Sequence, residues 1–208
     1  TSRFERVSAP SRVKPQTKQP KSVEPQRWPE TESVRDLWRQ AGPVSEQPEG
    51  AAWLAEHCIP GNPVDLCSLA RMLPKNARVP RWARCAGHSW PEAWRLLIPI
   101  YSLEGRCVSM AARCVLPDGK FKGVKECTPA GFTRTGGVYA DPMAVALLQG
   151  KTEHEGCRWN GEVVIAEGGK DYLTWAARAG RVTDSGETFA VMAIWQGAWS
   201  ADIPARIP

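Results

Sequence analysis

The sequence lacks any apolar run long enough to span a bilayer, which argues against insertion into a membrane. It also lacks a Cys-x-x-Cys pair and a charged-then-apolar leader, and its seven cysteines are an odd number. This usage is typical of a reduced, cytoplasmic protein. No initiator Met opens the chain at Thr1, so we expect it to be a fragment of a longer protein.

Paired metal ligands are missing as well. Structural zinc sites bring their ligands in two close pairs, and Cys85-x-x-His88 forms one such pair without a second. His57-Cys58 and His154-x-x-Cys157 have the same defect. We therefore predict no metal site from these residues and expect the cysteines to be buried thiols.

The composition is that of an ordinary globular protein, with 42% hydrophobic and 24% charged residues in 208 positions. This length allows one large or two small domains. The net charge of +5 suits a polyanionic partner, although much of the excess lies in the first segment. Ten tryptophans are many for this length, and core packing and base stacking are both open to them.

Residues 1–30 carry interspersed prolines and basic side chains and are predicted to form a flexible basic linker. It would either contact nucleic-acid phosphates or serve as a solvated tether. Residues 31–95 predict a helical subdomain, with a first helix from Thr31 capped by Thr31 or Ser33, a second at 48–58 and a third at 64–73.

Residues 96–160 predict a β-rich subdomain in which strands 96–101 and 107–115 flank a turn. A helix that begins at Asp141-Pro142 and a polar connection at 151–160 follow. Basic side chains suited to a single-stranded nucleic-acid backbone cluster on the expected hairpin: Arg106, Arg113, Lys120, Lys122 and Lys125. The alternative is an edge hairpin that its lysines protect from aggregation.

Residues 161–208 contain the unit around which the chain is organised. Val163–Ala166 form a short β-branched run, which predicts a strand buried on both faces and hence a parallel sheet. Glu167 ends this strand, and the turn at Gly168-Gly169 leads into a helix whose start carries Lys170 and Asp171. The apolar face of that helix is predicted to consist of Tyr172, Trp175, Ala176 and Ala179, with Gly180 as its end. A further apolar strand is predicted at 189–194.

A carboxylate at the carboxyl end of such a strand is placed where open α/β sheets hold their ligands. The run from Val163 to Leu173 resembles the first motif of the TOPRIM domain, the catalytic module of bacterial-type DNA primases, topoisomerases and related nucleases. The resemblance implies the first half of a Rossmann-like TOPRIM fold, with Glu167 as general acid/base. It also implies Mg²⁺, held in the family by an Asp-x-Asp pair that this sequence does not contain. The alternative is a Rossmann-like strand with a merely solvated Glu.

Upstream residues continue the resemblance to primases. Ile98-Pro99-Ile100, Glu104-Gly105-Arg106 and the strand that ends at Arg113 follow the order of elements in primases, although Ala111-Ala112 replace the usual glycines. The implied fold is α+β / α/β: a short helical subdomain, a β-rich hairpin subdomain and half of a TOPRIM domain.

The implied function is that of a DNA primase, a nucleotidyltransferase of DNA replication in a phage or mobile element. Such a protein binds single-stranded DNA and nucleotides, and a replicative helicase is the expected partner of the parent protein. This chain alone is expected to be inactive, because two-metal chemistry needs clustered carboxylates. A non-catalytic TOPRIM-scaffold module that binds nucleic acid and a TOPRIM nuclease relative are the alternatives.

Overall fold

The computed structural model describes residues 28–60, 66–133, 136–179, 186–195 and 207. Most of the predicted linker at 1–30 and the predicted end at Gly180 lie outside these ranges. The helices are α1 (Thr31–Gln40), η1 (Val44–Glu46), α2 (Pro48–Glu56), η2 (Trp90–Glu92), α4 (Pro142–Leu148) and α5 (Gly169–Ala179). The strands are β1 (Arg71–Met72), β2 (Arg84–Cys85), β3 (His88–Ser89), β4 (Leu96–Tyr101), β5 (Cys107–Arg113), β6 (Glu126–Cys127), β7 (Val138–Ala140), β8 (Glu153–His154), β9 (Cys157–Ala166) and β10 (Glu187–Ile194).

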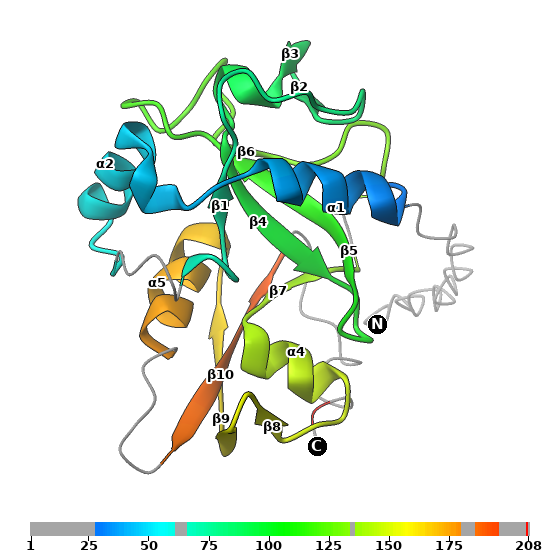
Figure 1. Cartoon of the computed structure of the whole chain (residues 1–208), viewed down its shortest axis with the longest axis vertical. Coiled ribbons are helices and arrows are strands. Elements are labelled where there is room, and N and C mark those ends of the chain that lie inside the picture. The colour runs from blue at the N-terminus through cyan, green and yellow to red at the C-terminus, as the bar shows by residue number, and fades with distance from the viewer. Residues whose placement is uncertain (1–27, 61–65, 134–135, 180–185, 196–206, 208) are drawn as a thin grey trace, which may run out of the picture.

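One mixed sheet organises the fold, which is α+β (Figure 1). Its strand order is β6-β5-β4-β7-β10-β9-β8, with β1 paired to β4, while β2 and β3 form a separate hairpin. Of the strand pairs that the described residues form, β9 with β10 is the parallel one and the others are antiparallel. The sequence predicted a parallel sheet, but among the described strands parallel pairing is limited to β9 and β10. Strands from 31–95, 96–160 and 161–208 all join the same sheet, and the boundaries between these segments stay predictions.

The two faces of β4 are covered by different elements, because side chains alternate along a strand. Leu97 belongs to a core with Leu37 of α1, whereas Ile98 belongs to a core with Leu173 of α5. Figure 1 shows α1 crossing the β4–β5 hairpin and α5 beside β9. Trp90, Trp94 and Trp195 are fully buried, which confirms core packing for these tryptophans.

The helices predicted near Thr31, Pro48 and Pro142 are confirmed. They were predictable because each follows local signals of periodicity or capping. The cap of α1 was predicted wrongly: Glu30 occupies the position, and neither Thr31 nor Ser33 caps the helix. The predicted helix at 64–73 is wrong in its described part. Leu66 is helical, but Cys67–Leu69 form a turn, and Arg71–Met72 then form β1, since pairing to Leu96–Leu97 of β4 satisfies their backbone.

Strand β9 differs from its prediction in two ways. It begins at Cys157, within the expected polar connection, because β8 folds back on its first residues. It is also not buried on both faces, since Ile165 is 46% exposed. Among the described strands, residues 163–166 pair on one side only, with β10, so they form a sheet edge.

Helix α5 buries a face that is rotated from the predicted one. Tyr172, Ala176 and Ala179 are buried as expected, but Trp175 is 43% exposed. Leu173 and Ala177 are buried instead, and they move the centre of the buried stripe away from Trp175. Trp175 lies against Arg178 at the edge of the stripe, 5.8 Å from guanidinium carbon to ring centre.

All seven cysteines are free thiols. Burial raises the pKa of Cys107 to about 11 and raises that of Cys127 further, so neither is a ready nucleophile at neutral pH. No helix in the described part of the chain has the length and apolarity to cross a membrane.

Candidate functional site

The carboxyl end of β9 presents a carboxylate and turns sharply into a helix. Glu167 follows Ala166 directly and is exposed. Gly168 has φ +139°, a conformation that L side chains rarely adopt, so the turn depends on glycine. Lys170 and Asp171 lie in the first turn of α5 and form a surface ion pair of 3.6 Å. The strand, acid, turn and helix therefore follow in the predicted order.

The start of α5 is packed tightly against β6. A Cβ atom on Gly169 would lie 2.7 Å from Oε2 of Glu126 and 2.9 Å from Cδ1 of Ile98. Glycine at this position therefore allows the backbone of the helix to approach another carboxylate. The contact brings residues from the predicted β-rich segment to the turn that follows Glu167.

Glu126 is the centre of a half-buried polar cluster. Nη1 of Arg113 lies 3.1 Å from its Oε2, and the hydroxyl of Tyr139 donates to its Oε1 at 2.7 Å. Both carboxylate oxygens are thus engaged. The guanidinium of Arg113 also lies over the ring of Trp53, 5.7 Å from its centre, and a hydrogen-bonded cation on an aromatic ring is held in one orientation.

Tyr139 is the buried member of the cluster. Its ring stacks on Tyr172 of α5, with centres 5.5 Å apart. Burial raises the pKa of Tyr139 well above its ordinary value, and the charge of the Glu126 carboxylate raises it further. The phenol therefore stays protonated and acts as a fixed hydrogen-bond donor to Glu126.

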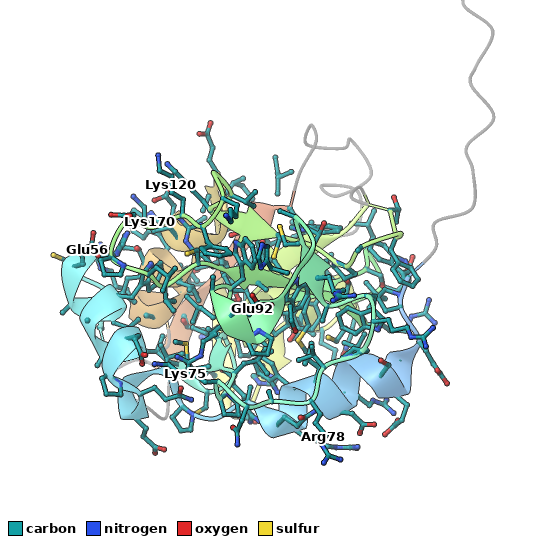
Figure 2. All side chains as sticks on the ribbon, turned by 90° about the horizontal axis from the view of Figure 1, so that it is seen from above. Glu56, Lys75, Arg78, Glu92, Lys120 and Lys170 are labelled. Atoms are coloured by element: carbon teal, nitrogen blue, oxygen red, sulfur yellow. The ribbon has the colours of Figure 1, made fainter. Side chains whose placement is uncertain are left out.

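Three exposed lysines, Lys120, Lys122 and Lys125, lie on the loop between β5 and β6, which we call the lysine loop (117–125). Lys122 and Gly123 both have positive φ, 49° and 77°, as a two-residue type I′ turn requires, and Phe121 pairs with Val124 across it. Seen from above, Lys120 and Lys170 lie toward the same side of the molecule (Figure 2). Lys125 precedes Glu126 directly, so the loop ends beside the start of α5.

The five predicted basic residues do not form one cluster. Arg106 and Arg113 flank opposite ends of β5, a strand of seven residues, and are therefore roughly 20 Å apart. Arg106 is exposed and lies 3.7 Å from Glu104. Arg113 and the lysine loop belong to the end of the sheet near Glu167, whereas Arg106 belongs to a different surface.

A metal site was not expected from the sequence of this chain, and Mg²⁺ was implied by the resemblance alone. Within the described ranges, no group of three or more His, Cys, Asp or Glu side chains is placed to hold a metal ion. Glu126, a carboxylate close to the turn, is already engaged by Arg113 and Tyr139. These residues do not by themselves fit a magnesium site.

Comparisons with known proteins show a likeness of fold but no match in sequence. No protein-family model matches the chain, and no curated protein sequence matches it. A solved structure described as the DnaG catalytic core matches with a TM-score of 0.50 at 13% identity, over 85% of this chain and 57% of that chain. This chain has a primase-like fold. At this identity the likeness shows the fold alone, and the chain spans little more than half of that core.

A second solved structure, the DnaG primase catalytic domain bound to ssDNA, has a TM-score of 0.49 at 14% identity, over 85% of this chain and 56% of that chain. The sequence predicts Glu167, Gly168 and the lysines as site residues, and it does not assign Glu126 or Tyr139 to the site. Their meeting depends on strand pairings between β4, β5, β6 and β7 that no local pattern encodes.

Proposed function

We propose that this chain is the template-binding part of a TOPRIM-type DNA primase, which holds single-stranded DNA and takes part in primer synthesis within a longer protein. The supporting observation is the contact between Gly169 and Glu126. It joins the lysine loop, which ends at Lys125, to the strand end that presents Glu167. The lysines that would bind a DNA strand and the carboxylate of Glu167 thus lie at the same end of the sheet.

The lysine loop supplies the binding part of this proposal. Its three lysines are exposed, and among the described aromatic side chains Phe121 lies near them, with its ring centre 5.8 Å from Nζ of Lys122. Such a loop contacts phosphates and carries little sequence information. A primase needs this kind of contact, because it must copy templates of different sequence.

Glu167 supplies the chemical part. Its carboxylate is exposed at the end of β9, where it is free to exchange a proton with a bound group. In the proposal it acts as the general acid/base at the primer hydroxyl. Arg113 is held by Glu126 and Trp53 and serves as a fixed cation at the same end. Magnesium, nucleotides, a replicative helicase and a phage or mobile-element origin are expectations for the parent protein, and no step is assigned to the metal.

The test is the binding of a fluorescently labelled oligothymidylate, measured by anisotropy over a range of salt concentrations. The variant K120A/K122A/K125A should bind roughly 10-fold more weakly, and its salt dependence should be shallower by about 2, since each lost phosphate contact removes about 0.7 from the slope. The matched control, R78A/R81A/R84A, removes the same charge from exposed arginines outside the lysine loop. Equal affinities and slopes in the two variants would make the lysine loop a solvated edge.

A further inference from the structure

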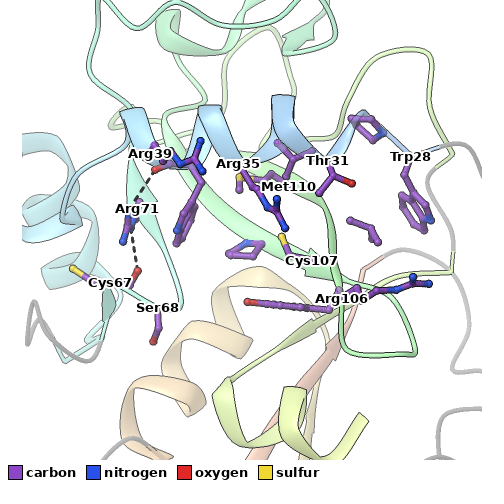
Figure 3. A pocket seen from close by; sticks show the side chains of 16 residues that line it. Trp28, Thr31, Arg35, Arg39, Cys67, Ser68, Arg71, Arg106, Cys107 and Met110 are labelled. Atoms are coloured by element: carbon purple, nitrogen blue, oxygen red, sulfur yellow. Dashed lines mark hydrogen bonds between the residues drawn. The ribbon is translucent and has the colours of Figure 1, made fainter. Parts of the chain in front are cut away.

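A second basic surface lies between α1 and the β4–β5 hairpin. It is a groove of about 680 Å³, which we call the α1 groove, and its walls come from α1, from the turn that precedes β1 and from the hairpin (Figure 3). Four arginines and three aromatic residues line it: Arg35, Arg39, Arg71, Arg106, Trp28, Trp38 and Tyr101. None of the described residues that line it is acidic.

Helix α1 separates its charges between two flanks. Arg35 and Arg39, one turn apart, line the α1 groove, whereas Glu32 and Asp36 line a separate depression on the other flank. The acids still reach the arginines: Glu32 lies 3.3 Å from Arg35 and 2.9 Å from Arg39, and Asp36 lies 2.9 Å from Arg39. All four side chains are more than half exposed, so these pairs are weak and exchange readily for another anion.

Arg71 is a fixed cation in the wall of the α1 groove. Its guanidinium carbon lies 4.7 Å from the centre of the Trp38 ring. Its Nε donates to the carbonyl of Cys67 at 3.2 Å, and its Nη1 donates to the carbonyl of Trp38 at 3.4 Å. A guanidinium has five N–H donors, so most remain for a ligand.

The α1 groove is distinct from the site at Glu167. Pro99 and Met110 form its floor and pair with each other on one face of the sheet. Ile98 points to the opposite face, where it contacts the start of α5. The α1 groove and the start of α5 therefore lie on opposite faces of the β4–β5 hairpin.

The cations are spread along the α1 groove and do not converge on one point. In Figure 3, Arg71 and Arg106 lie toward opposite ends, with Arg35 between them. One small anion needs convergent donors, whereas a chain of phosphates needs cations at intervals and aromatic faces for its bases. The arrangement matches the second case.

We infer that the α1 groove binds a segment of single-stranded nucleic acid, with arginines on the phosphates and aromatic rings beside the bases. This inference rests on the proposed function and extends it, because it adds a second contact on the face away from Glu167. The ligand chemistry, a phosphate next to a base, is shared by a free nucleotide, so the test must separate the two.

The first measurement is oligothymidylate anisotropy with R35A/R39A against R78A/R81A, which loses the same charge from residues outside the α1 groove. We expect R35A/R39A to bind about 3- to 10-fold more weakly, with a salt slope shallower by about 1.4, while R78A/R81A stays near the unaltered chain. Thermal unfolding should be alike in both, because the altered side chains are exposed.

The second measurement is photocrosslinking of an oligonucleotide that carries 5-bromodeoxyuridine, with the adducts located by mass spectrometry. Adducts on Trp28, Trp38 or Tyr101 are expected, and they should disappear in R35A/R39A. An excess of nucleoside triphosphate should reduce them little. The alternative outcome is that the triphosphate abolishes the adducts at a lower concentration than a competing oligonucleotide without bromodeoxyuridine. In that case the α1 groove is a nucleotide site and the inference is overturned.

The two proposals fail separately. If K120A/K122A/K125A weakens binding but R35A/R39A matches its control and no adduct maps to the α1 groove, the inference is overturned and the proposed function is unaffected. If R35A/R39A weakens binding but K120A/K122A/K125A matches its control, the inference about the α1 groove is supported and the lysine loop has no role in binding. An unaltered chain that binds no oligonucleotide overturns both.

Discussion

Gly169 and Glu126 are in direct contact, although 43 positions of sequence separate residue 169 from residue 126. The absence of a side chain at Gly169 lets α5 begin against a carboxylate that already binds Arg113 and Tyr139. The first turn of α5 and the cluster around Glu126 therefore depend on each other.

Replacement of Gly169 by Ala should destabilise the protein. The new methyl group would lie 2.7 Å from Oε2 of Glu126, and that side chain cannot turn away without losing its bonds to Arg113 and Tyr139. We expect the free energy of unfolding to fall by about 1–3 kcal/mol. Gly42→Ala is the control, since nothing lies within 4 Å of its Cβ position, and it should be close to neutral. Circular dichroism during heating measures both, and equal melting temperatures would contradict the packing described.

Alkaline pH should unfold the chain through its tyrosines. Burial raises the pKa of all three, Tyr101, Tyr139 and Tyr172. Unfolded tyrosines ionise near pH ~10, so above that pH the folded state holds more protons than the unfolded state and the free energy of unfolding decreases. Ultraviolet titration should show tyrosinate only as the fold is lost. A tyrosinate signal near pH ~10 with circular dichroism unchanged would refute this expectation.

Asp141 should make the protein less stable as the pH rises from acid to neutral. Its side chain caps α4 by accepting from the N–H of Ala144 at 2.7 Å, but burial raises its pKa to about 7. Because the folded pKa exceeds the unfolded one, the stabilisation is complete below pH ~4 and is lost as the pH rises through about 7.

Asp141→Asn keeps an oxygen for the cap and removes the charge. At pH 8 it should raise the free energy of unfolding by an amount on the order of 3 kcal/mol, with little change at pH 4. Urea unfolding at the two pH values measures this difference. Asp118→Asn, at an exposed turn, is the control and should show no such dependence. A gain of equal size at both pH values would assign the effect to packing and not to titration.

Glu167→Gln tests the chemistry in the parent protein. The side chain is exposed, so the substitution should leave the melting temperature nearly unchanged. A proton carrier is typically worth ~10²–10⁴-fold in rate, and primer synthesis should fall by about that factor. Single-stranded DNA binding should persist, which separates loss of chemistry from loss of template. Full activity of Glu167→Gln would show that Glu167 is only a solvated residue at the strand end and has no role in the chemistry.

Several local elements of this fold were predictable. Asp141-Pro142 signals the start of α4, the spacing of Val34 and Leu37 signals α1, and Gly168 marks the turn after β9. Each signal acts within a few residues, because helix caps, helical periodicity and positive φ are properties of short segments. The resemblance to primases rested on such segments in a fixed order, and the primase-like fold agrees with it.

Which distant residues come into contact depends on the tertiary structure. Pairing of β5 with β6 sets Arg113 opposite Glu126, and the exposure of Ile165 and Trp175 depends on which neighbours cover β9 and α5. The α1 groove likewise draws arginines from α1, from the start of β1 and from the β4–β5 turn. The order of strand, acid, turn and helix around Glu167 could be read from the sequence, since it follows from contacts between near neighbours. The partners of Glu126 and the positions of the two basic surfaces depend on strand pairing between distant segments, which local periodicity does not encode.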